Sequence, residues 1–342
     1  MKKIAIFQYD LGMGGIQKSL INLLNTIDLN KYKIDLYLFD KTKFFKNTIP
    51  KEIKVTYLKP ENKKFKRFDS ALKQSKLIIE GEYDYAIDFS SYSPDCAIGA
   101  IKANAKKRII WCHNDIDLKL KHEWKYKVLF HFMKSKHKYF DTVVAVSNGA
   151  KDGFYKKTKF QDIKVIPNLI NTDEIYEKEL EEVKFNVDED YYNIVAVGRL
   201  CHQKNYLESL TIMNKLKDEK IRLYIIGAGE EENLINTMIK DNNLKNVFLL
   251  GGKQNPYPYM SLMDALLLTS HYEGQGMVLL EAKALGLELY LPKRLERYVD
   301  NIVGQDDIVS SLKNATKKEK IKDNLKKYNK EIVKRLDELF KS

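Results

Sequence analysis

Residues 193–205, NIVAVGRLCHQKN, contain a short run of β-branched and small apolar residues that ends at Gly198 and leads into a loop with two cations. Buried strands of parallel sheets are near-continuous apolar runs of this kind. The pattern returns three times further along the chain, in residues 222–229, 246–252 and 264–270. Helical periodicity fills the intervals, in residues 205–218, 231–243 and 277–286. Strands that alternate with helices predict a doubly wound parallel α/β sheet.

The first half of the chain has the same organisation. Its apolar runs occupy residues 3–9, 34–39, 83–90, 107–113, 141–147 and 163–168. The acidic stretch 171–192 interrupts the alternation, and we place the domain boundary there. The predicted domains are therefore 1–172 and 173–312, followed by a C-terminal helix, 313–342, that packs on its own domain or crosses back to the first. Two such domains place a cleft between the carboxyl ends of two sheets, where ligands bind in this fold class.

Composition fits a globular protein with two domains. The chain has 342 residues, of which 44% are hydrophobic and 31% charged. Three cysteines without a CxxC pair predict a reducing compartment and no structural zinc. No apolar run reaches the roughly 18 residues of a spanning helix, and the opening MKKIAIFQYD fits a first strand better than a signal peptide. We expect a cytoplasmic protein.

The positive charge is concentrated in the first half. Residues 1–170 carry 33 Lys+Arg and 18 Asp+Glu, a net charge of +15, whereas the remaining 26 and 29 give −3. Free use of lysine, nucleic acid, an anionic membrane and a phosphorylated substrate are all compatible with this excess. The lysine-rich helical stretch 119–138 also contains Trp124, Phe130 and Phe132. Such a helix packs on its own domain, lies on anionic lipid or binds nucleic acid.

Three loops are candidates for holding phosphate. Gly14 and Gly15 follow a strand and open a helix, which suits an anion, although a simple tight turn needs the same glycines. Arg199 and Lys204 lie at the end of a strand, where they form a diphosphate clamp or ordinary surface charge. Glu273 lies in a glycine-rich loop before a helix. The loop amides could face phosphate, and Glu281, two turns into that helix, could accept both hydroxyls of a ribose.

Taken in order, these segments carry a family resemblance. VGRL…KN, IIGAGEEENL, VFLLGGKQNPYPYMSLMDALLLTS and EGQGMVLLEAKALG resemble the nucleotide-sugar-binding domain of family 4 glycosyltransferases, the retaining GT-B enzymes. GGIQKSL, IIWCHND, VVAVSNGAKDGF and IKVIPNLIN resemble landmarks of that family's N-terminal domain. The resemblance covers about residues 1–286 and is greatest to members that build capsule, O-antigen or teichuronic-type glycans. It implies the GT-B fold, two Rossmann-like domains that face a central cleft.

The resemblance also implies roles for individual residues. His113, near the anomeric carbon, and Glu273 would be the catalytic residues, although a histidine at this place could simply cap the sheet. The residues that would bind the donor are Gly14, Gly15, Arg199, Lys204, Gly274, Gly276, Met277, Val278 and Glu281. The segment 286–301, GLELYLPKRLERYVDN, departs from the family pattern and leaves the outer wall of the donor pocket undefined.

The function implied is retaining, metal-independent transfer of a sugar from a UDP-sugar, or a GDP-sugar, to a glycan or lipid-linked glycan acceptor. We predict no cofactor, no metal and no nucleic-acid partner, and we expect the protein in the cytoplasm or on the inner face of the membrane. Two DxD patterns, at 115–117 and 188–190, resemble a metal motif of another transferase fold. The alternatives are a nucleotide-sugar epimerase or hydrolase of the same fold and a basic nucleic-acid-binding protein.

Overall fold

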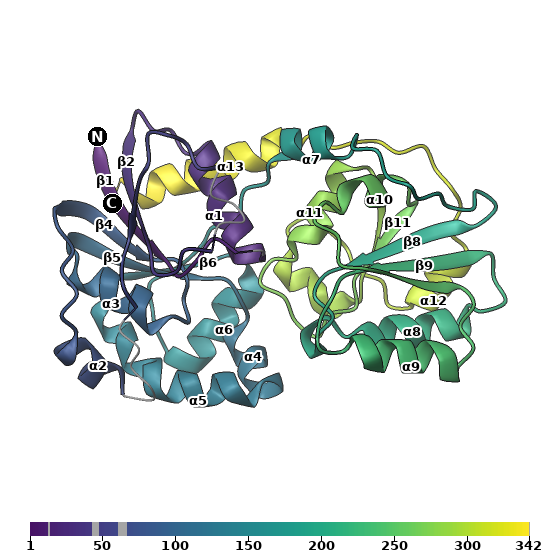
Figure 1. Ribbon diagram of the computed structural model, residues 1–342, viewed down its shortest axis with the longest axis horizontal. Helices are drawn as coiled ribbons and strands as arrows, with labels where there is room; N and C mark the ends of the chain where they lie inside the picture. Colours follow the sequence, from purple (N-terminus) through teal and green to yellow (C-terminus); the bar gives the residue numbers. More distant parts are fainter. Residues whose placement is uncertain (13, 43–47, 61–66, 342) are drawn as a thin grey trace. The chain divides into compact units, whose positions relative to one another are not determined.

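The chain forms two compact units in the computed structural model, which describes residues 1–12, 14–42, 48–60 and 67–341. Unit 1 comprises Met1–Leu169 and Lys327–Ser342, and unit 2 comprises Ile170–Lys326 (Figure 1). Each unit has a parallel sheet of its own, so the doubly wound α/β class predicted for both halves is confirmed.

Within its described residues, unit 1 has a seven-stranded sheet in the order β3-β2-β1-β4-β5-β6-β7, in which neighbouring strands pair in parallel. The strands are β1 (Lys2–Gln8), β2 (Tyr32–Leu38), β3 (Lys54–Tyr57), β4 (Glu82–Asp88), β5 (Asn104–Cys112), β6 (Thr142–Ala145) and β7 (Ile163–Val165). Strand order reverses between β1 and β4. Such a reversal opens a crevice at the carboxyl ends of the two strands.

Helices cover both faces of this sheet. They are α1 (Gly15–Thr26), α2 (Phe68–Gln74), α3 (Pro94–Lys102), α4 (Ile116–His122), α5 (Trp124–Met133), η2 (Lys134–Tyr139), α6 (Asn148–Thr158) and α13 (Lys326–Leu339). Successive side chains of β1 point to opposite faces. Ile4 and Ile6 pack in a core with α1 and α13, which lie beside each other in Figure 1, whereas Ala5 and Phe7 pack in a core with α2 and α3.

Among its described residues, unit 2 has a five-stranded parallel sheet in the order β10-β9-β8-β11-β12. The strands are β8 (Tyr192–Val197), β9 (Ile221–Ile226), β10 (Val247–Gly251), β11 (Ala265–Leu267) and β12 (Glu288–Tyr290). The helices are α7 (Thr172–Lys178), η3 (His202–Lys204), α8 (Tyr206–Lys215), α9 (Glu232–Asp241), α10 (Tyr257–Ser261), α11 (Met277–Ala284), η4 (Lys293–Tyr298) and α12 (Ile308–Lys313). The order of strands reverses between β8 and β11, which places a crevice there.

The tail differs from the predicted helix 313–342. The helix α13 begins only at Lys326, because Leu325 has a φ of 48°, outside the right-handed helical region. Residues 315–325 have no regular structure and belong to unit 2, where Lys320 donates to the carbonyl of Ser261 at 2.5 Å. The divide between the units at Leu169 and Ile170 lies three residues before the predicted boundary.

The lysine-rich stretch 119–138 is not one helix. Glu123 has φ −125° and ψ 93°, and this extended residue separates α4 from α5. Two of its lysines are buried and paired. The Nζ of Lys119 lies 3.1 Å from Glu123 Oε1, and that of Lys136 lies 2.8 Å from Asp88 Oδ2. Fewer lysines are therefore available to a partner than the sequence indicates.

Candidate active site

The two loops that follow β8 and β11 meet at the switch point of the unit 2 sheet. The β8 loop contains Arg199 and Lys204, and the β11 loop contains Glu273. Close packing with the neighbouring β9 loop depends on glycine, because a Cβ on Gly227 would lie 1.9 Å from the carbonyl oxygen of Gly198. Lys204 passes over Gly198, where an added Cβ would lie 3.1 Å from its Cε. The topology thus directs both charged loops to one place.

Lys204 and Glu273 form an ion pair at this place. Lys204 Nζ lies 2.8 Å from Glu273 Oε1, and the hydroxyl of Ser270 donates to the same oxygen at 2.6 Å. Glu273 is only 6% exposed. A buried ion pair is maintained where further hydrogen bonds satisfy its lone pairs, and Ser270 supplies one here. Sequence spacing did not indicate Ser270, whose role depends on the turn of the loop.

The glycine-rich loop leads directly into α11. Gly276 has a φ of 67°, in the left-handed region that favours glycine, and α11 begins at the next residue, Met277. Glycine has no side chain that could cap the helix. The first amides of a helix point out of its N-terminal end, so those of Met277 and Val278 face the end of α11 that follows the glycine-rich loop, a place suited to an anion.

Glu281 lies on the same helix and is held from a neighbouring element. The hydroxyl of Tyr257 in α10 donates to Glu281 Oε1 at 3.1 Å, and both side chains are buried. Burial and the negative charge of Glu281 raise the pKa of Tyr257 well above its usual range, so the phenol stays protonated and continues to donate. Tyr257 is a second residue that sequence analysis missed, because 24 positions separate it from Glu281.

Arg199 lies in a different environment from Lys204. Its Nη2 is 3.0 Å from Glu230 Oε2, and its side chain is 72% exposed. Exposed ion pairs contribute little to stability, so this pair can exchange for a phosphate at small cost. The two cations predicted to act as one clamp therefore differ: one is largely buried and held, the other is exposed.

In unit 1, His113 follows β5 and is buried. Its Nε2 lies 2.9 Å from the carbonyl oxygen of Phe89, which follows β4. Because a carbonyl only accepts, Nε2 carries the hydrogen and donates it, which leaves Nδ1 as an acceptor. Burial lowers the pKa of His113 to about 3, despite the opposing effect of the hydrogen bond to Phe89. The imidazole is therefore neutral at physiological pH.

Gly14 and Gly15 lie at the carboxyl end of β1, at the switch point of unit 1. Gly14 is the residue before α1, which begins at Gly15. Beside them Asp10 Oδ1 accepts from the side chain of Gln17 at 2.8 Å and from the amide of Gly12 at 2.8 Å. The intervening Met13 lies outside the described residues.

The aspartates of the first DxD pattern have other partners. Asp115 caps α4 by accepting from the amide of Leu118 at 3.1 Å. Asp117 pairs with Lys121, Lys156 and Lys157 at 3.0, 2.8 and 2.8 Å. Burial opposes ionisation of Asp117, but the hydrogen bonds from these lysines outweigh it and hold its pKa well below the usual range. Both carboxylates thus have a structural role in unit 1.

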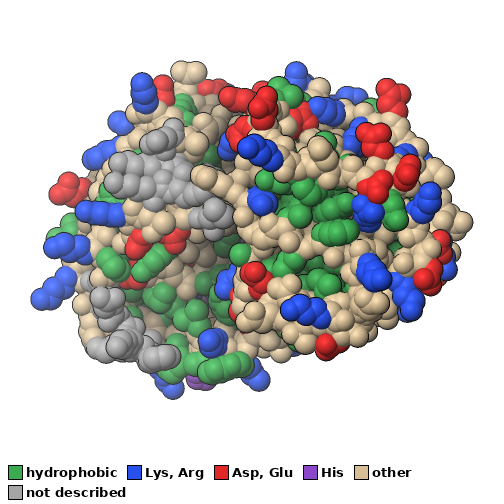
Figure 2. All heavy atoms as spheres, turned by 45° about the vertical axis from the view of Figure 1, so that its right-hand side comes forward, with side chains coloured by type: hydrophobic (Ala, Val, Ile, Leu, Met, Phe, Trp, Pro, Cys, Tyr) green, Lys and Arg blue, Asp and Glu red, His purple; other side chains and the backbone are tan. Residues whose placement is uncertain are grey.

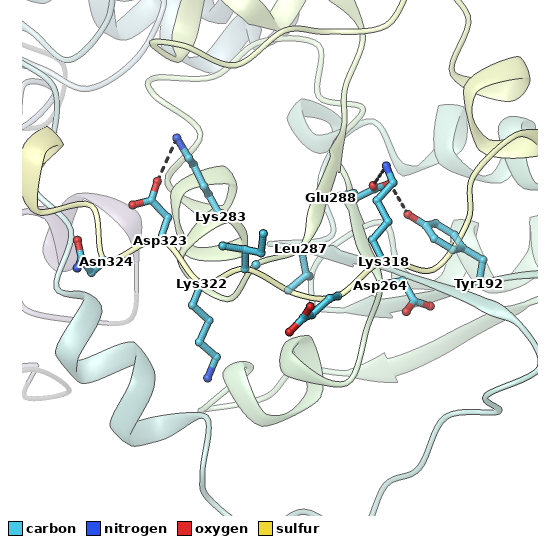
Figure 3. A pocket seen from close by; sticks show the side chains of 12 residues that line it. Tyr192, Asp264, Lys283, Leu287, Glu288, Lys318, Lys322, Asp323 and Asn324 are labelled. Carbon is cyan, nitrogen blue, oxygen red and sulfur yellow. Dashed lines mark hydrogen bonds and ion pairs between the residues drawn. The ribbon is translucent and has the colours of Figure 1, made fainter.

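A cavity of about 480 Å³ lies at the other end of the unit 2 sheet, at the amino ends of β8, β11 and β12 (Figure 3). Charged side chains of both signs line it and pair with one another: Lys283 Nζ lies 3.4 Å from Asp323 Oδ2, and Lys318 bonds Glu288. None of the predicted donor-binding residues of unit 2 is among the residues that line it. This cavity is separate from the candidate site.

Both halves of the chain match models of known protein families. Residues 13–174 match the model of Glycosyltransferase Family 4, and residues 177–289 match that of Glycosyl transferases group 1. Over 297 residues the chain is 28% identical to an N-acetylgalactosaminyltransferase of Campylobacter jejuni that acts on a diphospho-undecaprenol-linked sugar, with 83% of this chain and 79% of that protein covered. It is 29% identical to the poly(glycerol-phosphate) alpha-glucosyltransferase of Bacillus subtilis over 39% of this chain and 21% of that one.

Solved structures show the same fold. A mutant of Staphylococcus aureus TarM, in complex with fondaparinux, alpha-GlcNAc-glycerol and UDP, matches with a TM-score of 0.68 at 13% identity, over 100% of both chains. Anabaena HepE, in complex with UDP and glucose, matches with a TM-score of 0.69 at 15% identity, again over 100% of both. The predicted GT-B fold of two Rossmann-like domains is confirmed. With adjoining family models over both units, the chain is a glycosyltransferase, with a domain of the Glycosyltransferase Family 4 type in its first half and one of the Glycosyl transferases group 1 type in its second.

Proposed function

We propose that this glycosyltransferase is retaining and metal-independent, and that it transfers a sugar from a UDP-sugar to an acceptor in surface glycan synthesis. The observation that carries the donor assignment is the Lys204–Glu273 pair beside the first turn of α11, at the switch point of unit 2. The names of relatives that build such glycans support the acceptor class, and UDP in the TarM and HepE structures supports the nucleotide.

In this proposal the donor diphosphate lies against the α11 amides with Lys204 and Arg199 as its cations. Glu281, oriented by Tyr257, accepts the ribose hydroxyls. Preorganised amides and cations stabilise the charge that develops on the leaving diphosphate, which is the largest contribution expected in a reaction of this type. Glu273 sets the position of Lys204 and contacts the donor sugar.

The reaction breaks the bond between the anomeric carbon and the diphosphate oxygen, and that oxygen leaves with the electron pair. The acceptor hydroxyl attacks from the same face, forms the new glycosidic bond and passes its proton to the departing phosphate. His113 is neutral, so it contributes a hydrogen bond rather than a charge: its Nδ1 accepts from a hydroxyl of the transferred sugar. The bond to Phe89 fixes the ring for this contact.

A donor screen tests the proposal. Thermal shift against UDP-, GDP-, ADP- and CDP-sugars should select one nucleotide, since a ligand at 100 times its Kd adds about 2.7 kcal/mol of stability. Product analysis with and without a glycan acceptor then separates a transferase from an epimerase or hydrolase, and EDTA tests metal independence. A parent chain that binds none of the four donors, yet binds DNA with a steep salt dependence, would contradict the proposal.

We further propose that α5 places unit 1 on an anionic membrane, where a lipid-linked acceptor is presented. Trp124 is 70% exposed, Val128 lies one turn further on, and Lys125 and Lys127 are exposed beside them. An exposed indole with neighbouring lysines is suited to a lipid interface. The diphospho-undecaprenol in the name of the Campylobacter relative supports such an acceptor. None of the described helices has the length and apolarity to cross a bilayer.

Vesicle sedimentation tests this docking. Each lysine near an anionic surface contributes about 1 kcal/mol, so Lys125→Glu with Lys127→Glu should weaken binding to phosphatidylglycerol vesicles by more than tenfold. Lys215→Glu with Lys217→Glu is the matched control, because both lysines are exposed at the same spacing in unit 2. Equal losses in the two double variants, or equal binding to neutral vesicles, would contradict docking through α5.

A further inference from the structure

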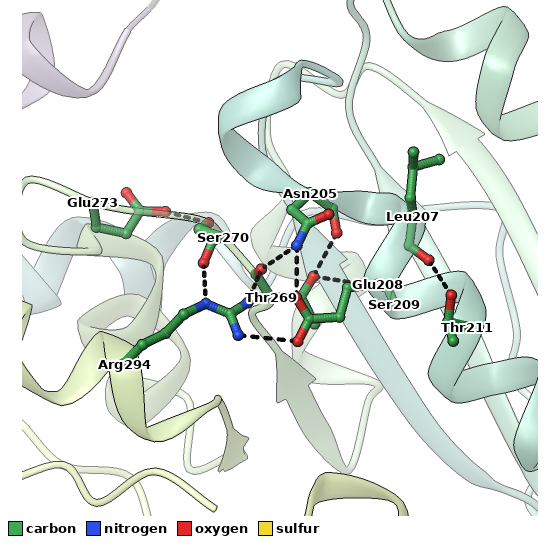
Figure 4. Close-up of polar contacts among 9 residues, drawn as sticks. All are labelled: Asn205, Leu207, Glu208, Ser209, Thr211, Thr269, Ser270, Glu273 and Arg294. Atoms are coloured by element: carbon green, nitrogen blue, oxygen red, sulfur yellow. Dashed lines mark hydrogen bonds and ion pairs between the residues drawn. The ribbon is translucent and has the colours of Figure 1, made fainter. Parts of the chain in front are cut away.

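Arg294 projects from η4 toward the candidate site, within the segment 286–301 that departs from the family pattern. Its Nε donates to the carbonyl of Ser270 at 3.1 Å, and its Nη2 donates to the carbonyl of Thr269 at 2.7 Å (Figure 4). Its Nη1 and Nη2 also bond the two carboxylate oxygens of Glu208, the former at 3.2 Å. One planar guanidinium thus contacts two separate elements in a forked geometry.

The two elements that Arg294 contacts are the supports of Lys204 and Glu273. Ser270 lies in the loop that leads from β11 to Glu273, and its hydroxyl donates to that carboxylate at 2.6 Å. Glu208, in the first turn of α8, accepts from the side chain of Asn205 at 2.6 Å. Asn205 directly follows Lys204 and has a φ of 51°, so its side-chain bonds hold a turn in the left-handed region.

The same two loops are also joined directly. The side chain of Asn205 donates to the carbonyl of Thr269 at 3.2 Å, and the hydroxyls of Ser209 and Thr269 lie 2.7 Å apart. The carbonyl of Thr269 therefore accepts hydrogen bonds from both Asn205 and Arg294 (Figure 4). The bonds among Arg294, Glu208, Asn205 and Thr269 thus form a closed ring at the start of the β11 loop.

We propose that Arg294 is a positioning residue for the donor site, which sets the relative position of Lys204 and Glu273 through Ser270 and Glu208. This inference rests on the proposed function, because it assigns Lys204 to the donor diphosphate. The Arg294–Glu208 pair is partly exposed, with side chains 39% and 31% accessible, so it contributes little to global stability. The pair instead fixes the geometry of the two loops, and small displacements of catalytic groups strongly reduce catalysis.

A double-mutant cycle tests this role. Binding of UDP, GDP, ADP and CDP to the full chain is measured by calorimetry, and kcat and KM are measured with the donor that the screen selects. Arg294→Gln should weaken binding of the preferred diphosphate by about tenfold in the parent and by less than about twofold in Lys204→Ala, because the two residues act through one arrangement. Arg294→Lys restores charge without the fork and should rescue only part of the loss.

Lys293→Gln is the matched control, because it removes the same charge from the neighbouring residue, whose Nζ pairs with Asp306 at 2.5 Å. It should leave diphosphate binding unchanged. Equal losses from Arg294→Gln in both backgrounds, full rescue by Arg294→Lys, or an equal loss in the control would each overturn the positioning role. If Lys204→Ala itself leaves binding unchanged, or if the parent binds none of the four, the proposed donor site fails, and the role of Arg294 fails with it.

Discussion

Polar groups at the carboxyl ends of the strands are held in opposite ways in the two units. In unit 2, Lys204 and Glu273 are charged and are held by contacts between loops. In unit 1, His113 is neutral and bonded to backbone, and the nearby charges of Asp88 and Lys136 are buried against each other. A site for a dianionic diphosphate needs cations and amides, whereas recognition of a neutral sugar needs hydrogen bonds. The difference supports the proposal that the donor diphosphate binds at unit 2 and that His113 of unit 1 contacts the sugar.

The excess of positive charge lies in unit 1, whereas the proposed diphosphate site lies in unit 2. Residues 1–170 carry a net charge of +15 and the rest −3. In Figure 2, acidic and basic side chains are mixed over the surface of unit 2, where the diphosphate site is proposed. Local pairing and helix termini decide where an anion binds, whereas net charge affects long-range attraction. The positive excess of unit 1 fits a surface partner better than the donor.

The largest expected effect is that of Lys204→Ala. Loss of a charge-assisted contact costs about 1.5–3 kcal/mol, so diphosphate affinity should fall by about 10- to 100-fold, with a similar fall in kcat/KM. The variant also leaves Glu273 buried without its cation, which should lower the free energy of unfolding by about 3 kcal/mol. Calorimetry and urea unfolding measure the two quantities separately.

Glu273→Gln is the companion variant. It keeps the shape of the side chain and removes the buried charge. Its free energy of unfolding should therefore fall less than that of Lys204→Ala, although its turnover should still be lost. If both variants bind diphosphate as tightly as the parent, the charged switch point of unit 2 is structural, and the contrast between the units loses its functional meaning.

A smaller effect is expected from the pH dependence of stability at His113. The imidazole pKa is about 3 in the folded chain and near 6.5 when unfolded, so the unfolded chain binds more protons between these pH values. Stability from the neutral ring is therefore complete above pH 6.5 and is lost as the pH falls toward 3. Between pH 7 and 5 the loss is about 2 kcal/mol.

His113→Asn should remove this loss. Urea unfolding at pH 7 and pH 5 gives the stability difference between parent and variant at each pH, and that difference should change by about 2 kcal/mol in favour of the variant at pH 5. His137, whose pKa burial also lowers to about 3, contributes equally to both chains and cancels. A difference that does not change with pH would mean that His113 is protonated in the folded state.

Glu281→Gln tests the ribose contact within unit 2. It keeps an acceptor oxygen beside Tyr257 but removes the charge, so donor affinity should fall by about tenfold with little change in stability. Tyr257→Phe should have a smaller effect in the same direction, because it removes only the group that orients Glu281. Unchanged affinity in Glu281→Gln would remove the ribose assignment.

The smallest effect is expected from Arg199→Ala. Arg199 is exposed and its partner Glu230 is exposed too, so solvent screens its attraction to a phosphate. We expect a loss of about fivefold or less in diphosphate affinity, which weakens further as salt increases. A loss as large as that in Lys204→Ala would show that Arg199 becomes buried when the donor binds.

Sequence patterns located the strands and the loops that follow them, because apolar runs and glycine-rich ends depend on local chemistry. They therefore brought Lys204, Glu273 and Glu281 to one sheet edge. They could not identify Arg294, since 86 positions separate it from Glu208 and its role depends on the path of η4. Likewise the break at Glu123 and the late start of α13 after Leu325 depend on single backbone angles that no periodicity encodes.

The central claim is that the donor diphosphate binds at the charged switch point of unit 2, while His113 in unit 1 acts on the sugar. Calorimetric binding of the preferred nucleoside diphosphate to Lys204→Ala and to His113→Ala tests it most directly. We predict that Lys204→Ala weakens binding by at least about tenfold and that His113→Ala, although its turnover falls strongly, binds the diphosphate like the parent. Parent-like binding in Lys204→Ala, together with lost binding in His113→Ala, would contradict the account.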